Sequence, residues 1–125
     1  MTTPLKPLMI LIAGPYRSGT NGDPEKIAEN LEAMNRAALK IFRAGHIPVV
    51  GEWFALPLIK TAGSQQLDDE IFMEIFDPVA HAVATRCDAC LRIGGASKGA
   101  DGMVELARSR GQQIFNRLED VPGVA

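Results

Sequence analysis

Two segments rich in glycine and hydroxyl groups have the composition expected of an anion or sugar site. They span residues 13–22 and 94–101, and a short apolar run precedes each of them. Glycine lets the backbone approach a ligand closely, and the first amide groups of a helix have no intrahelical partners. A guanidinium such as that of Arg17 could contact a phosphate or could equally be a solvated surface group. The candidate ligand-binding residues of the two segments are Gly14, Pro15, Arg17, Ser18, Gly19, Gly94, Gly95, Ser97, Lys98 and Gly99.

An acidic residue, Glu52, stands in the unusual segment 51–57, which is apolar yet contains glycine and proline. We expect this segment to be a loop that covers part of the molecule. Burial there would raise the pKa of Glu52 and make it a candidate catalytic acid, although it could equally be a surface residue. Trp53 and Phe54 in the same segment could stack on a nucleobase, or they could belong to the core or to an interface.

Cys87 and Cys90 have the C-x-x-C spacing of a redox pair or of half a zinc site. The chain has no second C-x-x-C, and its two histidines, His46 and His81, are not at zinc-finger spacing. Cys90 also falls in the apolar run 89–93. We therefore expect two reduced cysteines, and we predict neither a metal nor another cofactor.

The composition indicates one domain, spanning residues 1–125, with one core. The chain is 46% hydrophobic and 22% charged, which is ordinary for a globular domain. Its net charge of −2 gives no broad attraction for nucleic acid or for an anionic membrane. The apolar run at residues 8–13 is too short to span a membrane and lacks the features of a signal peptide. We expect a cytoplasmic protein whose ligand is a small molecule.

Strand-like and helix-like segments alternate along the chain, as a parallel sheet requires. Residues 8–12 form a continuous apolar run, which is typical of a central strand that is covered on both faces. Asp23 and Pro24 predict a helix start, and Gly45 predicts its end. Residues 47–50 are expected to form the second strand.

The second half of the chain predicts two more helices and two more strands. Residues 64–85 are helical in pattern, with an interruption at Asp77 and Pro78, because proline lacks an amide hydrogen. Asp77 would cap the second part of that helix, and Asp88 would cap an element boundary. The remaining expected elements are a strand at 89–93, a helix at 99–110 that Gly111 closes, and a short strand at 113–115.

These elements predict an α/β fold, a three-layer Rossmann-like (flavodoxin-like) sandwich with a parallel sheet of four or five strands. Right-handed crossovers favour the strand order 2-1-3-4. In this order the chain changes direction between the first and third strands, and ligands bind beyond the carboxyl ends of the strands at that point. The two glycine-rich segments would meet there.

Several segments of the chain resemble the nucleoside 2-deoxyribosyltransferase-like superfamily. Residues 13–16 resemble its A-G-P-Y/M start, and residues 87–93 resemble its C-D-A-v-l-r-i strand. Residues 97–101, followed by Ala107 and Gly111, resemble the S-x-G-A-d…A…G segment of its small DUF4406 branch, which residues 45–48 also fit. The resemblance covers most of the chain.

The resemblance implies a Rossmann-like homodimer or homotetramer that cleaves the N-glycosidic bond of deoxynucleosides or of their 5′-monophosphates. In that chemistry a glutamate in the last long helix attacks the anomeric carbon and forms a glycosyl-enzyme ester. The family pattern D-x-G-x-x-x-E puts this nucleophile at Met103, whose thioether cannot attack. Ser97 matches a serine of the monophosphate-cleaving relatives, so it could recognise a 5′-phosphate, or it could simply cap the helix.

Three further residues are candidates for the catalytic groups. Asp101 and Glu105 each point about 160 degrees around the helix from Met103, given 3.6 residues per turn. Asp101 either faces the ligand or interacts with the helix dipole, and Glu105 is either a relocated acid or a solvated partner of Arg108. Tyr16 matches the family's tyrosine, so its phenol could orient the nucleophile or stack on a base, or it could be a half-buried loop residue.

Two functions from different classes therefore remain open. The first is an N-glycosidase or deoxyribosyltransferase with a relocated acid. The second is a non-catalytic nucleotide-binding domain that has lost the nucleophile, which Met103 favours. Gly94, Gly95 and Gly99 argue against a purely structural domain, and a redox function would require both cysteines to be exposed.

Overall fold

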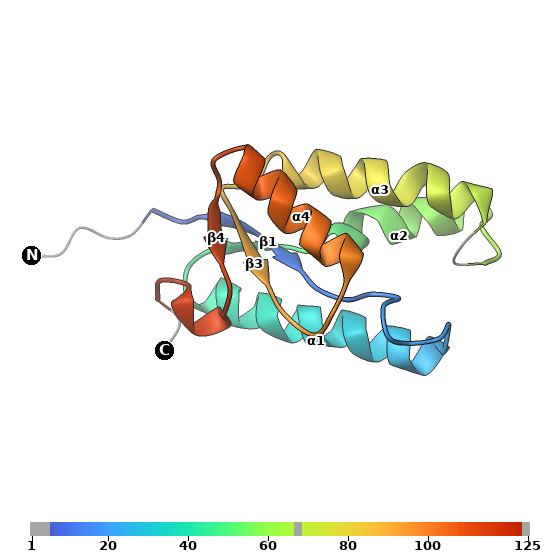
Figure 1. Ribbon diagram of the computed structural model, residues 1–125, viewed down its shortest axis with the longest axis horizontal. Helices are drawn as coiled ribbons and strands as arrows, with labels where there is room; N and C mark the ends of the chain where they lie inside the picture. Colours follow the sequence, from blue (N-terminus) through green and yellow to red (C-terminus); the bar gives the residue numbers. More distant parts are fainter. Residues whose placement is uncertain (1–5, 67–68, 124–125) are drawn as a thin grey trace, which may run out of the picture.

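A four-stranded parallel sheet forms the centre of the described part of the chain, which comprises residues 6–66 and 69–123 of the computed structural model (Figure 1). The strand order is β2-β1-β3-β4, and all neighbouring strands are parallel. The predicted Rossmann-like α/β architecture and strand order are therefore confirmed. The strands are β1 (Met9–Ala13), β2 (Ile47–Val49), β3 (Ala89–Arg92) and β4 (Gln113–Phe115).

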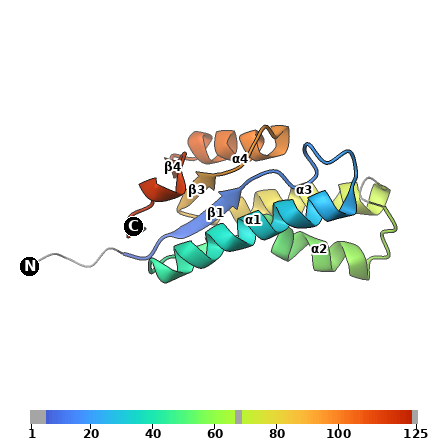
Figure 2. The same cartoon turned by 90° about the horizontal axis from the view of Figure 1, so that it is seen from below.

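Helices cover both faces of this sheet, with α1 on one side and α4 on the other (Figure 2). Side chains of α1 pack against Ile10 and Ile12 of β1, whereas side chains of α4 pack against Leu11 and Cys90 on the opposite face. The second helix packs against the third, and the last residues of the third helix, Val83 and Ala84, pack on the same face of the sheet as α4. The helices are α1 (Pro24–Arg43), α2 (Gly51–Thr61), α3 (Glu70–Ala84), α4 (Lys98–Ser109) and the 3-10 helix η1 (Leu118–Asp120).

The start and end of α1 follow the predicted capping residues. The side chain of Asp23 accepts a hydrogen bond from the N–H of Glu25 at 2.9 Å, and Pro24 occupies the first helical position. Gly45 follows the helix with a φ of 95°, a left-handed conformation that glycine adopts without strain. The helix therefore begins and ends where the local sequence predicted.

The expected loop at residues 51–57 is wrong, because this segment forms the first part of the helix α2. Its buried side chains, Glu52, Ala55 and Ile59, recur three and four residues apart and form one helical face. Ala55 and Ile59 pack with Phe72 of α3. This burial outweighs the cost of Pro57, about 3 kcal/mol inside a helix, and the proline ring lies on the exposed side.

The expected interruption at Asp77 and Pro78 is also wrong, because α3 continues through Pro78 as one helix. Its N-cap is Asp69, whose carboxylate accepts the N–H of Phe72 at 2.8 Å. That hydrogen bond and its other donors lower the pKa of Asp69 to about 2. Asp77 therefore does not cap a helix. The exposed Pro78 removes one amide from a helix that packing against α2 already stabilises.

The predicted start at residue 64 is wrong as well, because α3 begins at Glu70 and residues 64–66 are not helical. The remaining element boundaries agree with the prediction to within one residue, as is usual for helix and strand ends. The second and third strands each end one residue earlier than expected, and α4 spans Lys98–Ser109 rather than 99–110. Asp88 does act at an element boundary, since its carboxylate accepts the N–H of Met9 at 2.9 Å.

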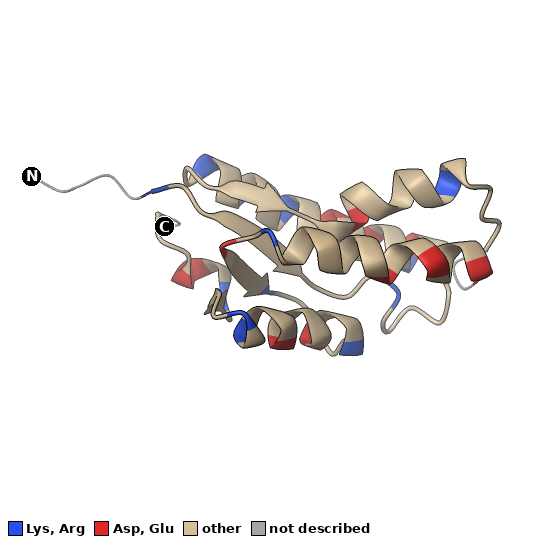
Figure 3. Ribbon diagram, turned by 90° about the horizontal axis from the view of Figure 1, so that it is seen from above, with Lys and Arg blue, Asp and Glu red and all other residues tan. Residues whose placement is uncertain are grey.

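Acidic and basic residues are interspersed along the ribbon (Figure 3). Along α4, for example, Lys98 and Arg108 flank Asp101 and Glu105. Within the described part of the chain, no helix has the length and apolarity needed to cross a membrane.

The buried side chain of His46 joins the start of the sheet to the end of the chain. Its Nδ1 accepts the N–H of Leu8 at 3.0 Å, and its Nε2 lies 2.8 Å from the carbonyl oxygen of Pro122. Both hydrogen bonds can form at once when Nε2 carries the ring proton and donates a hydrogen bond to the carbonyl oxygen of Pro122.

We predict that His46→Phe lowers the free energy of unfolding by about 1–3 kcal/mol, because it leaves two partly buried backbone groups without partners. Urea unfolding followed by circular dichroism measures the change. The exposed His81→Phe serves as the matched control and should leave the unfolding midpoint nearly unchanged. Equal midpoints for the His46 and His81 variants would contradict this assignment.

Candidate functional site

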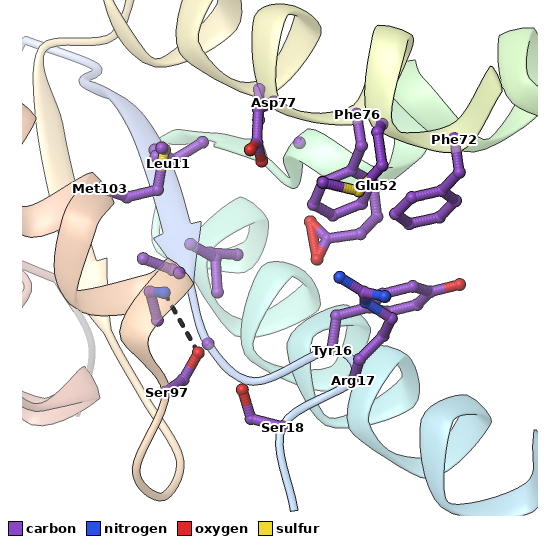
Figure 4. Close-up of a pocket in the computed structure, with 18 residues that line it drawn as sticks. Leu11, Tyr16, Arg17, Ser18, Glu52, Phe72, Phe76, Asp77, Ser97 and Met103 are labelled. Atoms are coloured by element: carbon purple, nitrogen blue, oxygen red, sulfur yellow. Dashed lines mark hydrogen bonds between the residues drawn. The ribbon is translucent and has the colours of Figure 1, made fainter. Parts of the chain in front are cut away.

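A cavity of about 430 Å³ lies at the carboxyl ends of β1 and β3 (Figure 4). This volume falls in the range of small-molecule sites. Its walls come from the end of β1 and the loop that follows it, from the first turn of α2, from α3, and from the first turns of α4. The cavity therefore lies at the predicted switch point of the sheet. The first turn of α2 contributes the candidate acid Glu52, and α3 forms a wall that the sequence did not indicate.

Close packing of two loops fixes the position of this cavity. Gly94 has a φ of 78°, and a Cβ atom there would lie 2.6 Å from Cδ of Pro15. A Cβ at Gly14 would lie 3.0 Å from Cγ1 of Ile93. The loops after β1 and β3 can approach this closely only because glycine occupies these positions.

The structure divides the ten predicted ligand-binding residues into two groups. Gly14, Arg17, Ser18, Ser97 and Gly99 line the cavity. The other five do not line it, and at least Pro15 and Gly94 serve loop packing instead. The residues in this second group are Pro15, Gly19, Gly94, Gly95 and Lys98.

Hydrogen bonds to α1 and within the loop hold the segment after β1 in place. The amide of Asn30 donates to the carbonyl oxygens of Tyr16 at 2.9 Å and of Ser18 at 3.4 Å. The buried Thr20 hydroxyl donates to the carbonyl oxygen of Arg17 at 2.6 Å. The sequence analysis did not find Asn30 or Thr20. Asn30 is one of two asparagines in a helix whose other residues are charged or apolar, and this was the available signal.

Glu52 is the most unusual titratable group of the cavity. It lies in the first turn of α2, only 8% of the residue is exposed, and its carboxyl group points into the cavity (Figure 4). Burial raises the pKa of Glu52 from its ordinary value of 4.5 to about 7, against a smaller opposing effect of its own backbone N–H. A large fraction of Glu52 therefore holds a proton at neutral pH. The alternative of a surface glutamate does not apply.

Aromatic rings form the wall of the cavity beside Glu52. The rings of Phe72 and Phe76 stack with centroids 4.9 Å apart, and the ring of Tyr16 stacks on Phe76 at 5.9 Å. The guanidinium of Arg17 lies 5.0 Å from the ring centroid of Phe72. Burial, with a smaller effect of the nearby Glu52 carboxylate, raises the pKa of Tyr16, so its phenol stays protonated.

Trp53 and Phe54, which were candidates for stacking on a base, do not line the cavity. They are 39% and 48% exposed, respectively. The indole N–H of Trp53 donates to Oδ1 of Asn35 on α1 at 2.8 Å. The aromatic wall comes from α3 and from the loop after β1 instead.

The start of α4 borders the opposite side of the cavity. The hydroxyl oxygen of Ser97 accepts the N–H of Ala100 at 3.1 Å, so Ser97 caps the helix and also lines the cavity. Further along α4, Met103 lines the cavity as well. The position that the family resemblance gives to the nucleophile is therefore at the site, but it holds an unreactive side chain.

Asp101 and Glu105 both lie outside the cavity. The carboxylate of Asp101 accepts a hydrogen bond from Nε of Arg92 at 3.1 Å. The Arg92 guanidinium also donates to the carbonyl oxygen of Gly95 at 2.8 Å and to that of Ile93. Glu105 lies 3.4 Å from Arg108, with both side chains exposed. Asp101 thus stabilises the loop before α4, and Glu105 is part of a surface ion pair.

Asp77 is the acidic residue of the cavity that the sequence analysis missed as a site residue. It lies on α3, and its carboxylate points into the cavity (Figure 4). Phe72, Phe76, Asp77 and Ala80 all line the cavity and share one face of α3. That spacing was a usable signal, but the proline after Asp77 favoured the interpretation as a helix cap.

Neither cysteine is placed for redox chemistry. Cys87 and Cys90 are both free and buried. Burial raises the pKa of each thiol to about 11, so the reactive thiolate is scarce at neutral pH. No cluster of three or more His, Cys, Asp or Glu suited to a metal ion occurs within residues 6–66 and 69–123.

No protein-family model matches this chain, and no curated protein matches it significantly.

We predict that the buried Glu52 makes stability depend on pH. Its folded pKa of about 7 exceeds the ordinary value of 4.5, so its contribution is present below pH 4.5 and is lost as the pH rises through 7. The full loss corresponds to roughly 3 kcal/mol at most. Glu52→Gln, which stays uncharged, should therefore gain stability relative to the wild type as the pH rises.

Urea unfolding of both proteins at several values between pH 4.5 and pH 8 measures this difference. The exposed Glu74→Gln on α3 is the matched control. A difference between wild type and Glu52→Gln that does not change with pH would contradict the raised pKa.

Proposed function

We propose that the cavity binds a nucleoside or a nucleoside 5′-monophosphate and that the protein cleaves its N-glycosidic bond. The observation that carries this proposal is the buried Glu52 carboxyl, which faces a cavity with an aromatic wall and whose pKa is about 7. An acid whose pKa lies near neutral pH is suited to protonate a departing nucleobase. Stacked aromatic rings are suited to hold the planar base beside it.

The residues that resemble the nucleoside 2-deoxyribosyltransferase-like superfamily support this proposal, because several of them border the cavity. Gly14 and Tyr16 belong to the A-G-P-Y segment, and Ser97 and Gly99 belong to the S-x-G-A segment. The two segments are far apart in the sequence and meet at one site. The resemblance and the geometry therefore point to the same place on the molecule.

In the proposed reaction, the base leaves as its glycosidic nitrogen receives the proton of Glu52. The bond between C1′ and this nitrogen breaks, and its electron pair stays with the base. Tyr16 remains a neutral phenol beside Glu52 and can donate a hydrogen bond to the ligand. Hydrolysis and transfer to a second base differ only in the acceptor of the sugar.

The start of α4 is suited to the sugar or its 5′-phosphate. The helix start presents backbone N–H groups and a favourable dipole to an anion, and Ser97, Gly99 and Ala100 line the cavity there. The hydroxyl of Ser97 accepts a hydrogen bond from Ala100, so its own O–H can still donate to a ligand.

A second candidate function is nucleotide binding without catalysis. The specific observation in its favour is Met103, which lines the cavity at the position where the family resemblance puts the nucleophilic glutamate. A binding domain would keep the aromatic wall and the helix start but would not require an acid that titrates near neutral pH.

We further propose that the protein is a cytoplasmic homodimer or homotetramer. Exposed apolar side chains on α1, β2 and α2 support an interface on that side of the molecule. They are Leu39, Phe42, Ile47, Trp53, Phe54 and Leu58.

The enzymatic proposal predicts free-base release from a panel of deoxynucleosides and their 5′-monophosphates, measured by chromatography. Glu52→Gln should lower the rate about 10²–10⁴-fold, the usual contribution of a general acid. It should have little effect on the first turnover of an N7-methylated purine deoxynucleoside, whose base leaves without a proton. The wild-type kcat/KM should fall as the pH rises above 7, because Glu52 loses its proton.

Glu105→Gln, which lies outside the cavity, is the control and should match the wild type. If the wild type releases no base from any substrate at high enzyme concentration, the enzymatic proposal is wrong. Calorimetric binding of the same nucleotides would then support the non-catalytic alternative.

A further inference from the structure

The proposed reaction needs a second group that stabilises or attacks the sugar as the base leaves. Met103 cannot supply it, and Asp101 and Glu105 lie outside the cavity. Among the described residues, two carboxylates line the cavity, Glu52 and Asp77. Asp77 is therefore the available candidate for the second group.

The position of Asp77 suits contact with a bound ligand. Its carboxylate points from α3 into the cavity, between Glu52 on one side and Leu11 and Met103 on the other in the view of Figure 4. Ser97 lies on the opposite wall. A sugar between the aromatic wall and the start of α4 would lie in the cavity that the Asp77 carboxylate faces.

Asp77 has no evident structural role within residues 6–66 and 69–123. Asp69, rather than Asp77, caps α3. No hydrogen bond or ion pair between described residues involves the Asp77 carboxylate, in contrast to Asp101 with Arg92 and Asp120 with Arg117. A helical aspartate that faces a cavity without a protein partner is available to a ligand.

The surroundings of the two carboxyl groups assign different roles to them. Glu52 is buried beside aromatic rings, whereas Asp77 is exposed to solvent at the cavity. A buried carboxyl tends to keep its proton, as a general acid must, whereas a carboxyl group that is exposed at the cavity is open to contact with the sugar. In glycosidases, two carboxyl groups in different surroundings can act as the general acid and as the nucleophile. Here the surroundings suit Glu52 to the first role and Asp77 to the second.

We propose that Asp77 is the nucleophile of this site, a role moved from α4 to α3, and this inference rests on the proposed N-glycosidase function. A carboxylate oxygen of Asp77 bonds to C1′ while the bond from C1′ to the base breaks. The electron pair of the broken bond goes to the base, which takes the proton of Glu52.

In the second step, water attacks C1′ of the Asp77 ester. The Glu52 carboxylate takes a proton from this water, the bond between C1′ and the Asp77 oxygen breaks, and its electron pair returns to the carboxylate. The sugar leaves with a hydroxyl at C1′, and both side chains return to their initial protonation states.

The test compares Asp77→Asn with the wild type on two substrates, a deoxynucleoside and an N7-methylated purine deoxynucleoside. Asp77→Asn should lower base release on the order of 10³-fold or more on both, because the nucleophile is needed whether or not the base requires a proton. In the first turnover, Glu52→Gln should release base slowly from the first substrate alone, because its second role, as the base that activates water, comes after base release. Glu74→Gln, an exposed acid on the same helix, is the matched control and should equal the wild type.

A 2-fluorinated sugar analogue provides a readout that folding alone would not change. Fluorine beside C1′ slows both steps through an oxocarbenium-like transition state, so an ester can accumulate when the leaving group is reactive. Mass spectrometry of the wild type should show one added fluorosugar, and peptide mapping should place it on Asp77. The mass of Asp77→Asn should not change, and its circular dichroism and thermal unfolding should match the wild type.

The failure of this inference can be distinguished from the failure of the proposed function. If the wild type releases base and Asp77→Asn retains that activity, or if the label lies on another residue, the Asp77 assignment is overturned and the glycosidase remains. If the wild type releases no base from either substrate, both are overturned.

Discussion

The burial of β1 on both of its faces is the constraint on which the rest of the structure depends. Ile10 and Ile12 pack under α1, and Leu11 packs under α4, with all three side chains 4% exposed or less. A strand covered in this way must lie in the middle of a parallel sheet, with β2 and β3 beside it. Its carboxyl end therefore opens between two helical layers, and the cavity begins at that point.

The cavity combines a rigid frame with one energetically unfavourable group. Glycine at positions 14 and 94 lets the two loops touch, and Asn30 and Thr20 hold the loop after β1 from behind. Burial of the Glu52 carboxyl opposes its ionisation and is offset by the packing of α2 on α3. Functional sites commonly retain such a group where a more stable neutral residue would fit.

The local sequence predicted those parts of the fold that short-range rules control. The apolar run of β1, the cap at Asp23 and the end at Gly45 depend on neighbouring residues only, and the structure has them as expected. It also predicted that the loops after β1 and β3 meet. The segment 51–57 and Pro78 were misinterpreted, because proline disfavours a helix locally while packing between α2 and α3 stabilises one.

By itself, the sequence determined the α/β class, the strand order and the end of the sheet where the cavity lies, since these follow from hydrophobic patterns and the handedness of crossovers. Only the tertiary structure decided which acids reach that place. Asp101 and Glu105 are close to Met103 in the sequence but turn away from the cavity, whereas Glu52 and Asp77 enter it from two other helices. The rotation of each helix about its axis and the approach of elements distant in the sequence decide which side chains reach the cavity. Neither is encoded in the local spacing of residues.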